Sequence, residues 1–171
     1  MTTRRPSQSA PILQPELVPT PLHNLSVHRR ARQSGRRTEW DRLRAVVLAE
    51  ARDACAYCGV VWHTRQVCHE EWEYDDERGV VTLVGFAIAC QLCNFALHPG
   101  MAGSPDVDRG KEAVEQMMKV NGMSRREVDQ LLSEAGAEFR RRSTMQWTIT
   151  VAPEVLRRFP LTAIVDGTTT A

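Results

Sequence analysis

The sequence lacks any apolar run of the ~20 residues that a membrane-spanning helix needs, so we expect no transmembrane segment. Its start carries arginines but no apolar stretch, which argues against a secretory signal peptide. Five prolines within the first 21 residues argue against the amphipathic helix of an organellar transit peptide. We therefore expect a cytoplasmic protein, in whose reducing surroundings paired cysteines more often bind metal than form disulfides.

Net charge is also small, at +1, and says little about partners by itself. Its distribution is uneven, because residues 1–37 hold seven arginines and a single acidic residue, Glu16. This Pro-, Ser-, Thr- and Arg-rich stretch has no sustained periodicity, so we predict a disordered basic arm. Two interpretations of the arm stay open: a tether for nucleic acid or a protein partner, and a solvated tail.

At 171 residues, 42% of them hydrophobic, the chain suits one domain with a modest core. We place it at residues 38–160, followed by a frayed Thr-rich tail at 161–171. Thr38 is expected to cap the first helix, and Ser124 begins a capping box with Glu127. Without visible repeats, the pattern predicts an α+β fold with helices over 38–54, 91–98, 108–120, 124–142 and 153–159, and strands within 60–73 and over 80–89 and 147–151.

Two cysteine pairs share the spacing C-x-x-C: Cys55 with Cys58, and Cys90 with Cys93. Each pair offers two thiolates from one tight turn, and two such turns can hold one tetrahedral zinc ion. Four thiolates leave no open position, so we expect a structural ion that contributes much of the folding free energy. For Cys68, three roles stay open: a buried small side chain, a ligand at a second site, and a reactive thiol.

A second group of polar residues accompanies these cysteines. His69 follows Cys68 directly, and Asn94 and His98 lie four residues apart in the expected short helix, on one of its faces. If the strands and this helix pack as a ββα unit, His69 faces the same side. A neutral imidazole beside a divalent ion can deprotonate a water for attack on phosphorus. The plainer interpretation is that each residue is a hydrogen-bonded structural group.

Several segments resemble the HNH endonucleases, and more narrowly a group of bacterial HNH proteins with a His-Glu-x-Trp-x-Tyr-Asp segment. They are CAYCG at 55–59, HEEWEYDD at 69–76, LVGFAIACQLCNFALHPG at 83–100, MKVNGMSRREVD at 118–129 and FRRRSTMQW at 139–147. The resemblance covers roughly residues 38–155. It implies a zinc-stapled ββα-metal finger, similar to a treble clef, over residues 55–100, with flanking helices over 108–143.

The resemblance also implies roles for individual residues. His69 matches the general base of the family, and His98 matches the second histidine of its helix. Asn94 stands where the family usually has a metal-binding histidine, Cys68 where many members have another ligand, and Gly85 near the usual asparagine. An Asn94 amide oxygen suits Mg²⁺, whereas a Cys68 thiolate suits softer ions such as Zn²⁺.

The remaining charged and aromatic residues carry less specific expectations. We interpret the acidic residues between Glu70 and Glu77 as mostly a solvated turn, with support of a metal as the alternative for one or two of them. Trp72 and Tyr74 are expected to pack on the finger rather than to stack on bases. Candidate contacts to phosphates are the surface arginines Arg36, Arg37, Arg125, Arg126, Arg140, Arg141 and Arg142.

The leading function predicted from the sequence is a metal-dependent HNH-type endonuclease that hydrolyses DNA phosphodiester bonds. In it, the four cysteines hold structural zinc, Asn94 and His98 partly hold Mg²⁺ or another divalent ion, and His69 activates water. The alternative is a catalytically inactive zinc-stabilised module that binds nucleic acid or protein. Asn94 and Cys68 favour the module, whereas His69 and His98 favour the enzyme.

Overall fold

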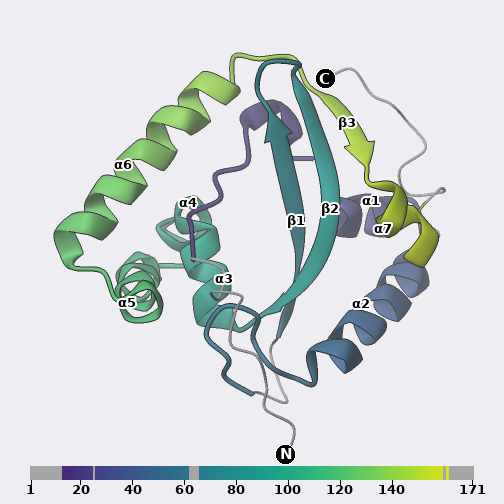
Figure 1. Cartoon of the computed structure of the whole chain (residues 1–171), viewed down its shortest axis with the longest axis horizontal. Helices are drawn as coiled ribbons and strands as arrows, with labels where there is room; N and C mark the ends of the chain where they lie inside the picture. Colours follow the sequence, from purple (N-terminus) through teal and green to yellow (C-terminus); the bar gives the residue numbers. More distant parts are fainter. Residues whose placement is uncertain (1–12, 25, 62–65, 160, 162–171) are drawn as a thin grey trace, which may run out of the picture.

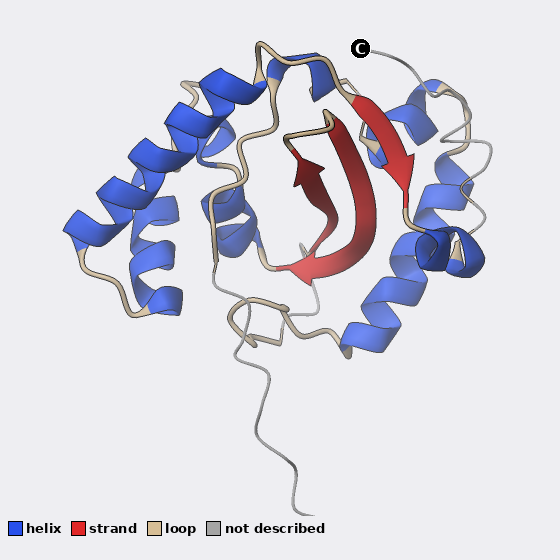
Figure 2. Ribbon diagram, turned by 45° about the horizontal axis from the view of Figure 1, so that its top comes forward, coloured by secondary structure: helices blue, strands red, loops and turns tan. Residues whose placement is uncertain are grey.

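A computed structural model gives the fold and describes residues 13–24, 26–61, 66–159 and 161 (Figure 1). A curved three-stranded sheet lies between two groups of helices (Figure 2). Its strands are β1 (Val67–Asp75), β2 (Val80–Ala89) and β3 (Thr148–Val151), in the order β1-β2-β3. β1 and β2 form an antiparallel hairpin, and β3 runs parallel to β2. The mixed α+β class is thus as predicted.

The hairpin agrees closely with its sequence signals. β2 has the predicted bounds, and a turn at residues 76–79 joins it to β1. The register shifts where Glu71 pairs with Gly85 and Trp72 pairs with Leu83, so one residue of β2 bulges. A Cβ at Gly85 would lie 2.6 Å from Oε2 of Glu71, so a side chain there would displace the end of this flexible glutamate.

One group of helices comprises α1 (Val27–Gln33), α2 (Arg37–Ala51) and α7 (Pro153–Arg158). The predicted apolar stripe of α2 is buried here, with Trp40, Leu43 and Val47 in the core. The expected cap was wrong: Thr38 lies inside α2, whose N-cap residue, Arg36, makes no side-chain capping bond. The helix also ends three residues early, because Arg52 and Asp53 adopt positive φ angles of 51° and 57°.

The other group contains α3 (Gln91–Leu97), α4 (Pro99–Ala102), α5 (Gly110–Asn121) and α6 (Arg125–Arg142). Three of these were predicted, and the capping box between Ser124 and Glu127 is present. α4 was not predicted: α3 ends before Pro99, close to the expected end, but Pro99 also begins a new short helix, since its fixed φ and missing N–H are tolerated in a first turn.

The predicted disordered arm over residues 1–37 is wrong for the part that the structure describes. Residues 13–24 cross the body of the molecule, with one 3₁₀ turn, η1 (Thr20–Leu22), and α1 follows after Ser26 caps it. Five apolar side chains of this stretch are buried: Leu13, Pro19, Leu22, Val27 and Ala31. Residues 1–12 lie outside the described residues.

Two features explain this ordering. Prolines stiffen the unfolded segment, which lowers the entropy lost when it docks. Specific hydrogen bonds then fix it: the backbone N–H of Glu16 donates to the carbonyl of Leu97 at 2.6 Å, and the Asn121 side chain bonds both backbone groups of Leu13 at 2.8 and 2.9 Å. The prediction of disorder used the composition of the whole stretch, in which a few apolar residues that dock on the body carry little weight.

Of the predicted frayed tail at 161–171, the structure describes only residue 161. Leu161 is buried beside Phe159 in the core around α1, α2 and α7, so the packed body extends at least to residue 161. Residues 162–171 lie outside the described part. Within the part that is described, no helix is both long enough and apolar enough to span a membrane.

Candidate metal centres

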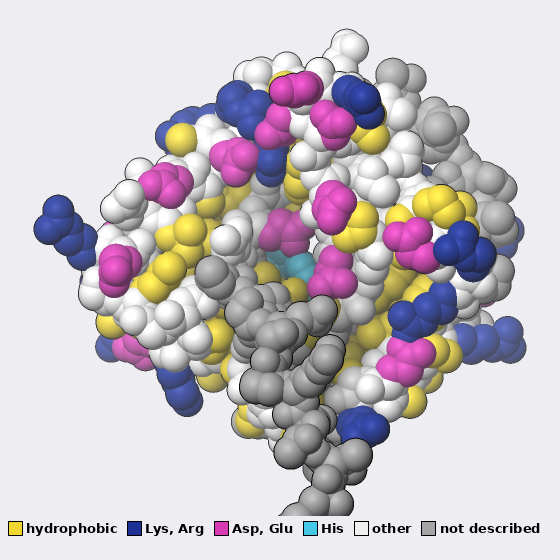
Figure 3. Space-filling view, in the orientation of Figure 1, with side chains coloured by type: hydrophobic (Ala, Val, Ile, Leu, Met, Phe, Trp, Pro, Cys, Tyr) yellow, Lys and Arg dark blue, Asp and Glu magenta, His cyan; other side chains and the backbone are white. Residues whose placement is uncertain are grey.

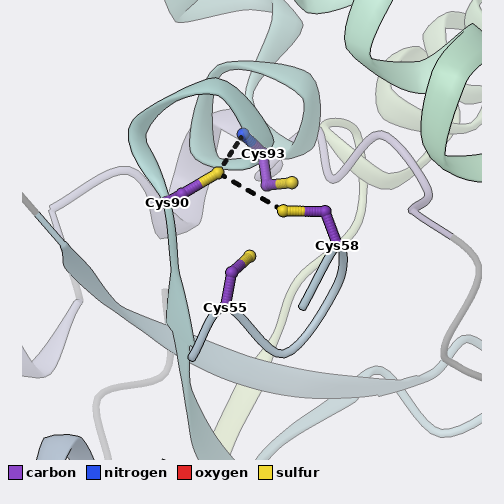
Figure 4. A group of neighbouring side chains, drawn as sticks. All are labelled: Cys55, Cys58, Cys90 and Cys93. Carbon is purple, nitrogen blue, oxygen red and sulfur yellow. Dashed lines mark hydrogen bonds between the residues drawn. The ribbon is translucent and has the colours of Figure 1, made fainter. Parts of the chain in front are cut away.

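The four cysteines of the two C-x-x-C pairs meet beside the base of α3 (Figure 4). Their sulfur atoms converge, and all lie within 4.8 Å of one another. The Sγ atoms of Cys58 and Cys90 are 3.8 Å apart. Zn–S bonds of about 2.3 Å place the sulfurs of a tetrahedral site about 3.8 Å apart. The four cysteines therefore form a group able to hold a metal ion such as zinc, as the spacing predicts.

Local backbone geometry positions both pairs. In the first, the N–H of Gly59 donates to the Cys55 carbonyl at 2.9 Å, and Gly59 has a φ of +71° that glycine adopts without strain. The N–H of Ala56 donates to the carbonyl of Ile88, which ties this turn to β2. In the second pair, Cys90 is the N-cap of α3, and its sulfur accepts from the N–H of Cys93 at 3.5 Å.

Hydrogen bonds among the sulfurs distribute the protons of the cysteine cluster unequally. Those from the Cys90 and Cys93 thiols lower the pKa of Cys55 far below its ordinary range, and the same contacts with Cys55 raise the pKa of Cys90 and Cys93. Nε2 of buried Gln116 donates to Sγ of Cys93 at 3.1 Å. A tetrahedral ion held by four sulfurs has no open position. An ion held by all four cysteines would therefore have no position left for a substrate.

Cys68 does not join the cluster. It is buried in the core formed with α1, α2 and α7, and burial raises the pKa of its thiol to about 12. Of the three roles left open, the buried small side chain fits this environment. A thiol that stays protonated is neither a reactive nucleophile nor a ready metal ligand.

A second cluster consists of Glu16, His69 and His98, with one potential ligand atom from each within 4.8 Å of the others. The Nε2 atom of His69 lies 2.9 Å from Oε2 of Glu16, and the ring centroids of the two histidines are 5.1 Å apart. His69 is 6% exposed and Glu16 is 19% exposed, so both are largely shielded from water. The two predicted histidines thus meet as the sequence indicates, with a carboxylate between them.

Three elements build this second cluster: β1 carries His69, the residue after α3 is His98, and the N-terminal segment supplies Glu16. Nδ1 of His98 lies 3.3 Å from the backbone carbonyl of Glu16. A carbonyl can only accept, so Nδ1 carries the hydrogen and Nε2 keeps its lone pair for a metal. Burial, followed by the nearby His69, lowers the pKa of His98, which favours the neutral form that binds metal.

A cavity of about 900 Å³ opens onto this cluster. Most of its walls are apolar or aromatic, including Leu22, Trp72, Tyr74 and Phe139. Figure 3 shows histidine at the bottom of a hollow with acidic side chains around it. Cavities of this size and apolar character, with a few polar groups that converge, are typical of ligand sites.

Asn94 and Gly85, two positions singled out by the HNH resemblance, differ in their relation to the cavity. Asn94 lines the cavity together with His98, as their shared helix face predicts. Gly85 contributes no side chain, and the Glu71 carboxylate fills the space beside it. The position near the usual asparagine of HNH proteins is therefore covered by an acidic residue of the neighbouring strand.

The arginines proposed for phosphate contacts do not gather around the cavity. Arg36 and Arg37 begin α2, whereas Arg125 and Arg126 begin α6 in the other helix group. Several of them face acids on their own helix: Arg36 lies 3.2 Å from Glu39, Arg37 lies 3.8 Å from Asp41, and Arg125 lies 2.8 Å from Asp129. Arg29 is the one lysine or arginine among the described lining residues.

The acidic run of β1 is less uniform than the predicted solvated turn. Glu70 is buried, its Oε1 accepts from the N–H of His28 at 3.0 Å, and burial raises its pKa. Asp76 accepts hydrogen bonds from Arg141 and Arg142 at 2.7 to 3.0 Å. Glu71, Glu73 and Glu77 are exposed, as expected.

The aromatic residues of β1 pack, as predicted, but not against the cysteine cluster. Tyr74 meets Trp147 edge to face at 5.3 Å, and the Arg142 guanidinium lies 4.2 Å from its ring centroid. Trp72 is partly buried against the same core, which also contains Val81 and Ile149. Both side chains also line the cavity, so their packing and a contact to a ligand are compatible.

Glu16 is the residue that sequence reasoning missed. It was counted only as the single acid of a basic arm, with no role in a site. One signal was available: a lone carboxylate flanked by prolines and apolar residues, which is unusual for a solvated tail. Because Glu16 is far from His69 and His98 in the sequence, no local pattern indicated that the three side chains meet.

The comparisons with known proteins add no relative. No protein-family model matches the chain, and neither the curated proteins nor the solved structures include a match.

Proposed function

We propose that the protein is a metal-dependent hydrolase of phosphodiester bonds, of the HNH endonuclease type, acting on DNA. The observation that carries the proposal is the convergence of Glu16, His69 and His98 in a cavity beside the four-cysteine cluster. The consecutive elements β1, β2 and α3 give the strand-strand-helix order that the resemblance implies. A four-cysteine zinc ion would staple this unit without taking part in the reaction.

His69 is the proposed general base. Glu16 accepts the hydrogen of its Nε2, so Nδ1 has a free lone pair that can take a proton from water. The hydroxide oxygen then bonds to phosphorus, and the bond from phosphorus to the leaving oxygen breaks. The leaving oxygen takes a proton from solvent, so the products are a phosphate monoester and a hydroxyl.

His98 and Glu16 are the proposed ligands of a divalent ion. His98 offers Nε2, and Glu16 has one carboxylate oxygen beyond the one that contacts His69. Asn94, on the same cavity wall, can add an amide oxygen. When bound, the ion would stabilise the charge that develops on phosphorus and on the leaving oxygen.

A catalytically inactive zinc-stabilised module remains the second candidate, and one observation favours it. The described lining of the cavity contains two carboxylates, Glu16 and Glu70, but only one arginine, Arg29. Uncompensated acids repel a phosphate chain. This module would use its surface for binding and its histidines for structure.

Plasmid nicking separates the two functions. We expect the purified full chain to nick supercoiled plasmid with Mg²⁺, Mn²⁺ or Ni²⁺. His69→Ala should lower the rate at least ~100-fold, since general-base catalysis contributes this much. His98→Ala should lower the rate because it removes a ligand of the divalent ion. His23→Ala is the matched control, because His23 is an exposed histidine that also lines the cavity. Folded wild type that fails to nick with every metal would point to the module.

A further inference from the structure

A second, smaller hollow of about 440 Å³ lies against α1. Ser26, His28 and Arg29 line both this hollow and the main cavity, so the two spaces adjoin. Arg32 and Gln33 belong to the lining of the hollow alone. The described lining contains no carboxylate, and both arginines are exposed, so a ligand can reach them from solvent.

Two guanidinium groups of this hollow have no partner in the described part of the chain. Arg29 and Arg32 lie three residues apart, and so on one face of α1. Neither side chain forms an ion pair or a hydrogen bond with a described residue, whereas Arg36 pairs with Glu39 at 3.2 Å. The N–H donors of both groups are therefore available to an anion.

Positive charge around the hollow is not offset by neighbours in the sequence. Residues 26–38 contain five arginines and no acidic residue. Burial, and next the positive charge of Arg32, lower the pKa of His28, whereas Asp41 raises it. The charge of Arg32 therefore extends across the lining, and like charges that meet in a concave surface attract a counter-charge.

Hydrogen bonds fix the hollow relative to the proposed general base. The backbone N–H of His28 donates to Oε1 of Glu70 at 3.0 Å, and Glu70 follows His69 on β1. Oγ of Ser26 accepts from the backbone N–H of Arg29 at 3.2 Å, which holds the first turn of α1. A ligand held by α1 therefore has a defined position with respect to the cavity that contains His69.

The two adjoining spaces differ in charge, and this difference indicates the ligand. The main cavity has two carboxylates and one arginine in its described lining, whereas the hollow has two arginines and no acid. Guanidinium groups bind phosphate through paired N–H donors. A nucleic-acid strand can place one phosphate at the metal site and another in the hollow, so it fits both spaces together.

We propose that Arg29 and Arg32 bind a phosphate of the substrate strand other than the one that is cleaved. The inference rests on the proposed hydrolase function and defines its substrate class: a polynucleotide with a second phosphate, rather than an isolated phosphodiester. The contact also offsets the repulsion that the acids of the main cavity exert on the strand.

Binding is tested apart from the reaction. Fluorescence anisotropy measures the affinity of a short labelled DNA duplex for the zinc-loaded full chain, without a second divalent ion and at several salt concentrations. Arg29→Gln and Arg32→Gln should each weaken binding about tenfold, because each removes a charged hydrogen bond. The double variant should also lower the salt slope by about 0.9, the value for one phosphate contact.

Arg109→Gln is the matched control for charge. Arg109 is an exposed arginine at the start of α5, in the other helix group, and it pairs with Glu112 at 2.7 Å. Its substitution removes the same charge as the two tested changes, and the duplex should bind nearly as to wild type. All three side chains are exposed, so the variants should melt like wild type.

Two substrates then test the role of the second phosphate in the reaction. Bis(para-nitrophenyl) phosphate has a single phosphate, whereas plasmid DNA has others on either side of the bond that is cleaved. Arg29→Gln and Arg32→Gln should lower kcat/KM for the plasmid about tenfold and leave hydrolysis of the small diester nearly unchanged.

Several results would overturn the subsite. They are absence of duplex binding by wild type, equal weakening in Arg109→Gln, no weakening in either tested variant, and an equal loss of activity on the small diester. Inorganic phosphate that competes as strongly as the duplex would make the hollow a site for a free anion instead. Duplex binding that depends on both arginines without hydrolysis would keep the subsite and reject the hydrolase, whereas nicking that ignores both substitutions would do the reverse.

Discussion

The cysteine cluster and the Glu16–His69–His98 cluster differ in how they are assembled. The cysteines come from two short turns, each held by hydrogen bonds within a few residues of the sulfurs. The second cluster joins residues 16, 69 and 98 from three separate elements. One cluster consists of four soft donors, whereas the other brings two imidazoles and a carboxylate together at the border of a cavity.

Under the proposed function, the cysteine cluster would serve folding and the Glu16–His69–His98 cluster would serve the reaction. Four thiolates fill a tetrahedral ion and leave nothing to bind substrate. An ion held by the His98 imidazole, the Glu16 carboxylate and the Asn94 amide would keep positions open, as in hydrolytic metal sites. Removing metal should therefore unfold the protein at one cluster and only alter its chemistry at the other.

The largest expected effect is loss of the fold when the cysteine cluster is broken. Cys93→Ser, or prolonged chelation of the wild type, should abolish the cooperative unfolding transition. Structural zinc sites have apparent binding free energies of about 10–16 kcal/mol, which exceeds the total stability of most small domains. Circular dichroism melting with metal analysis measures this effect.

Cys68→Ala is the matched control, since Cys68 is also buried but lies in another core. It should keep one zinc ion and lose roughly 1 kcal/mol of unfolding free energy. If Cys93→Ser melts like wild type, the cysteine cluster does not stabilise the fold and the prediction is wrong.

An effect of intermediate size is expected from binding of a second metal ion at the Glu16–His69–His98 cluster. We expect zinc-loaded protein to bind one further Mn²⁺ or Ni²⁺ ion, stabilising the fold by about 2.7 kcal/mol at a free concentration 100 times Kd. Glu16→Gln and His98→Ala should abolish this binding and leave the melting of the zinc-loaded protein nearly unchanged. Titration calorimetry and thermal melting at several ion concentrations measure both.

His69→Ala sharpens this comparison further. If His69 acts as base, the variant should keep the second ion but not the nicking activity; loss of both would make His69 a ligand instead. Glu73→Gln, an exposed neighbour on β1, serves as control. Binding of the second ion by Glu16→Gln as by wild type would dismiss Glu16 as a ligand.

Local signals predicted most of the regular elements. The apolar run of β2 and the capping box of α6 depend on neighbours a few residues apart, and both have the expected bounds. Errors fell where distant contacts decide: residues 13–24 dock on α3 and α5 through Leu97 and Asn121, which no local pattern reveals. The parallel pairing of β3 with β2 is likewise set by helices in between.

The two candidate metal sites differ in the same respect: one follows from local sequence and the other depends on distant contacts. The C-x-x-C spacing predicted the four-cysteine cluster in full, because each turn is a local structure. The spacing of Asn94 and His98 placed two cavity residues, but neither the arrival of Glu16 nor the burial of Glu70 follows from nearby sequence. A carboxylate becomes a candidate ligand only once the fold brings it to an imidazole.

The smallest expected effect is on the rate of zinc loss, when a residue that contacts a cysteine ligand is changed and the ligands stay intact. Gln116, on α5, donates to the Cys93 sulfur, and such outer hydrogen bonds change metal affinity about 10–100-fold. Gln116→Leu should therefore speed the loss of zinc to a chelator by about tenfold while the zinc-loaded fold keeps its melting temperature, because leucine retains the packing. The control is Gln130→Leu: Gln130 is exposed on α6, its amide donates to Glu134, and this variant should match wild type. Equal zinc loss in all three proteins would mean that the cysteine turns alone set the affinity, whereas unfolding of zinc-loaded Gln116→Leu would make Gln116 part of the core rather than of the metal site.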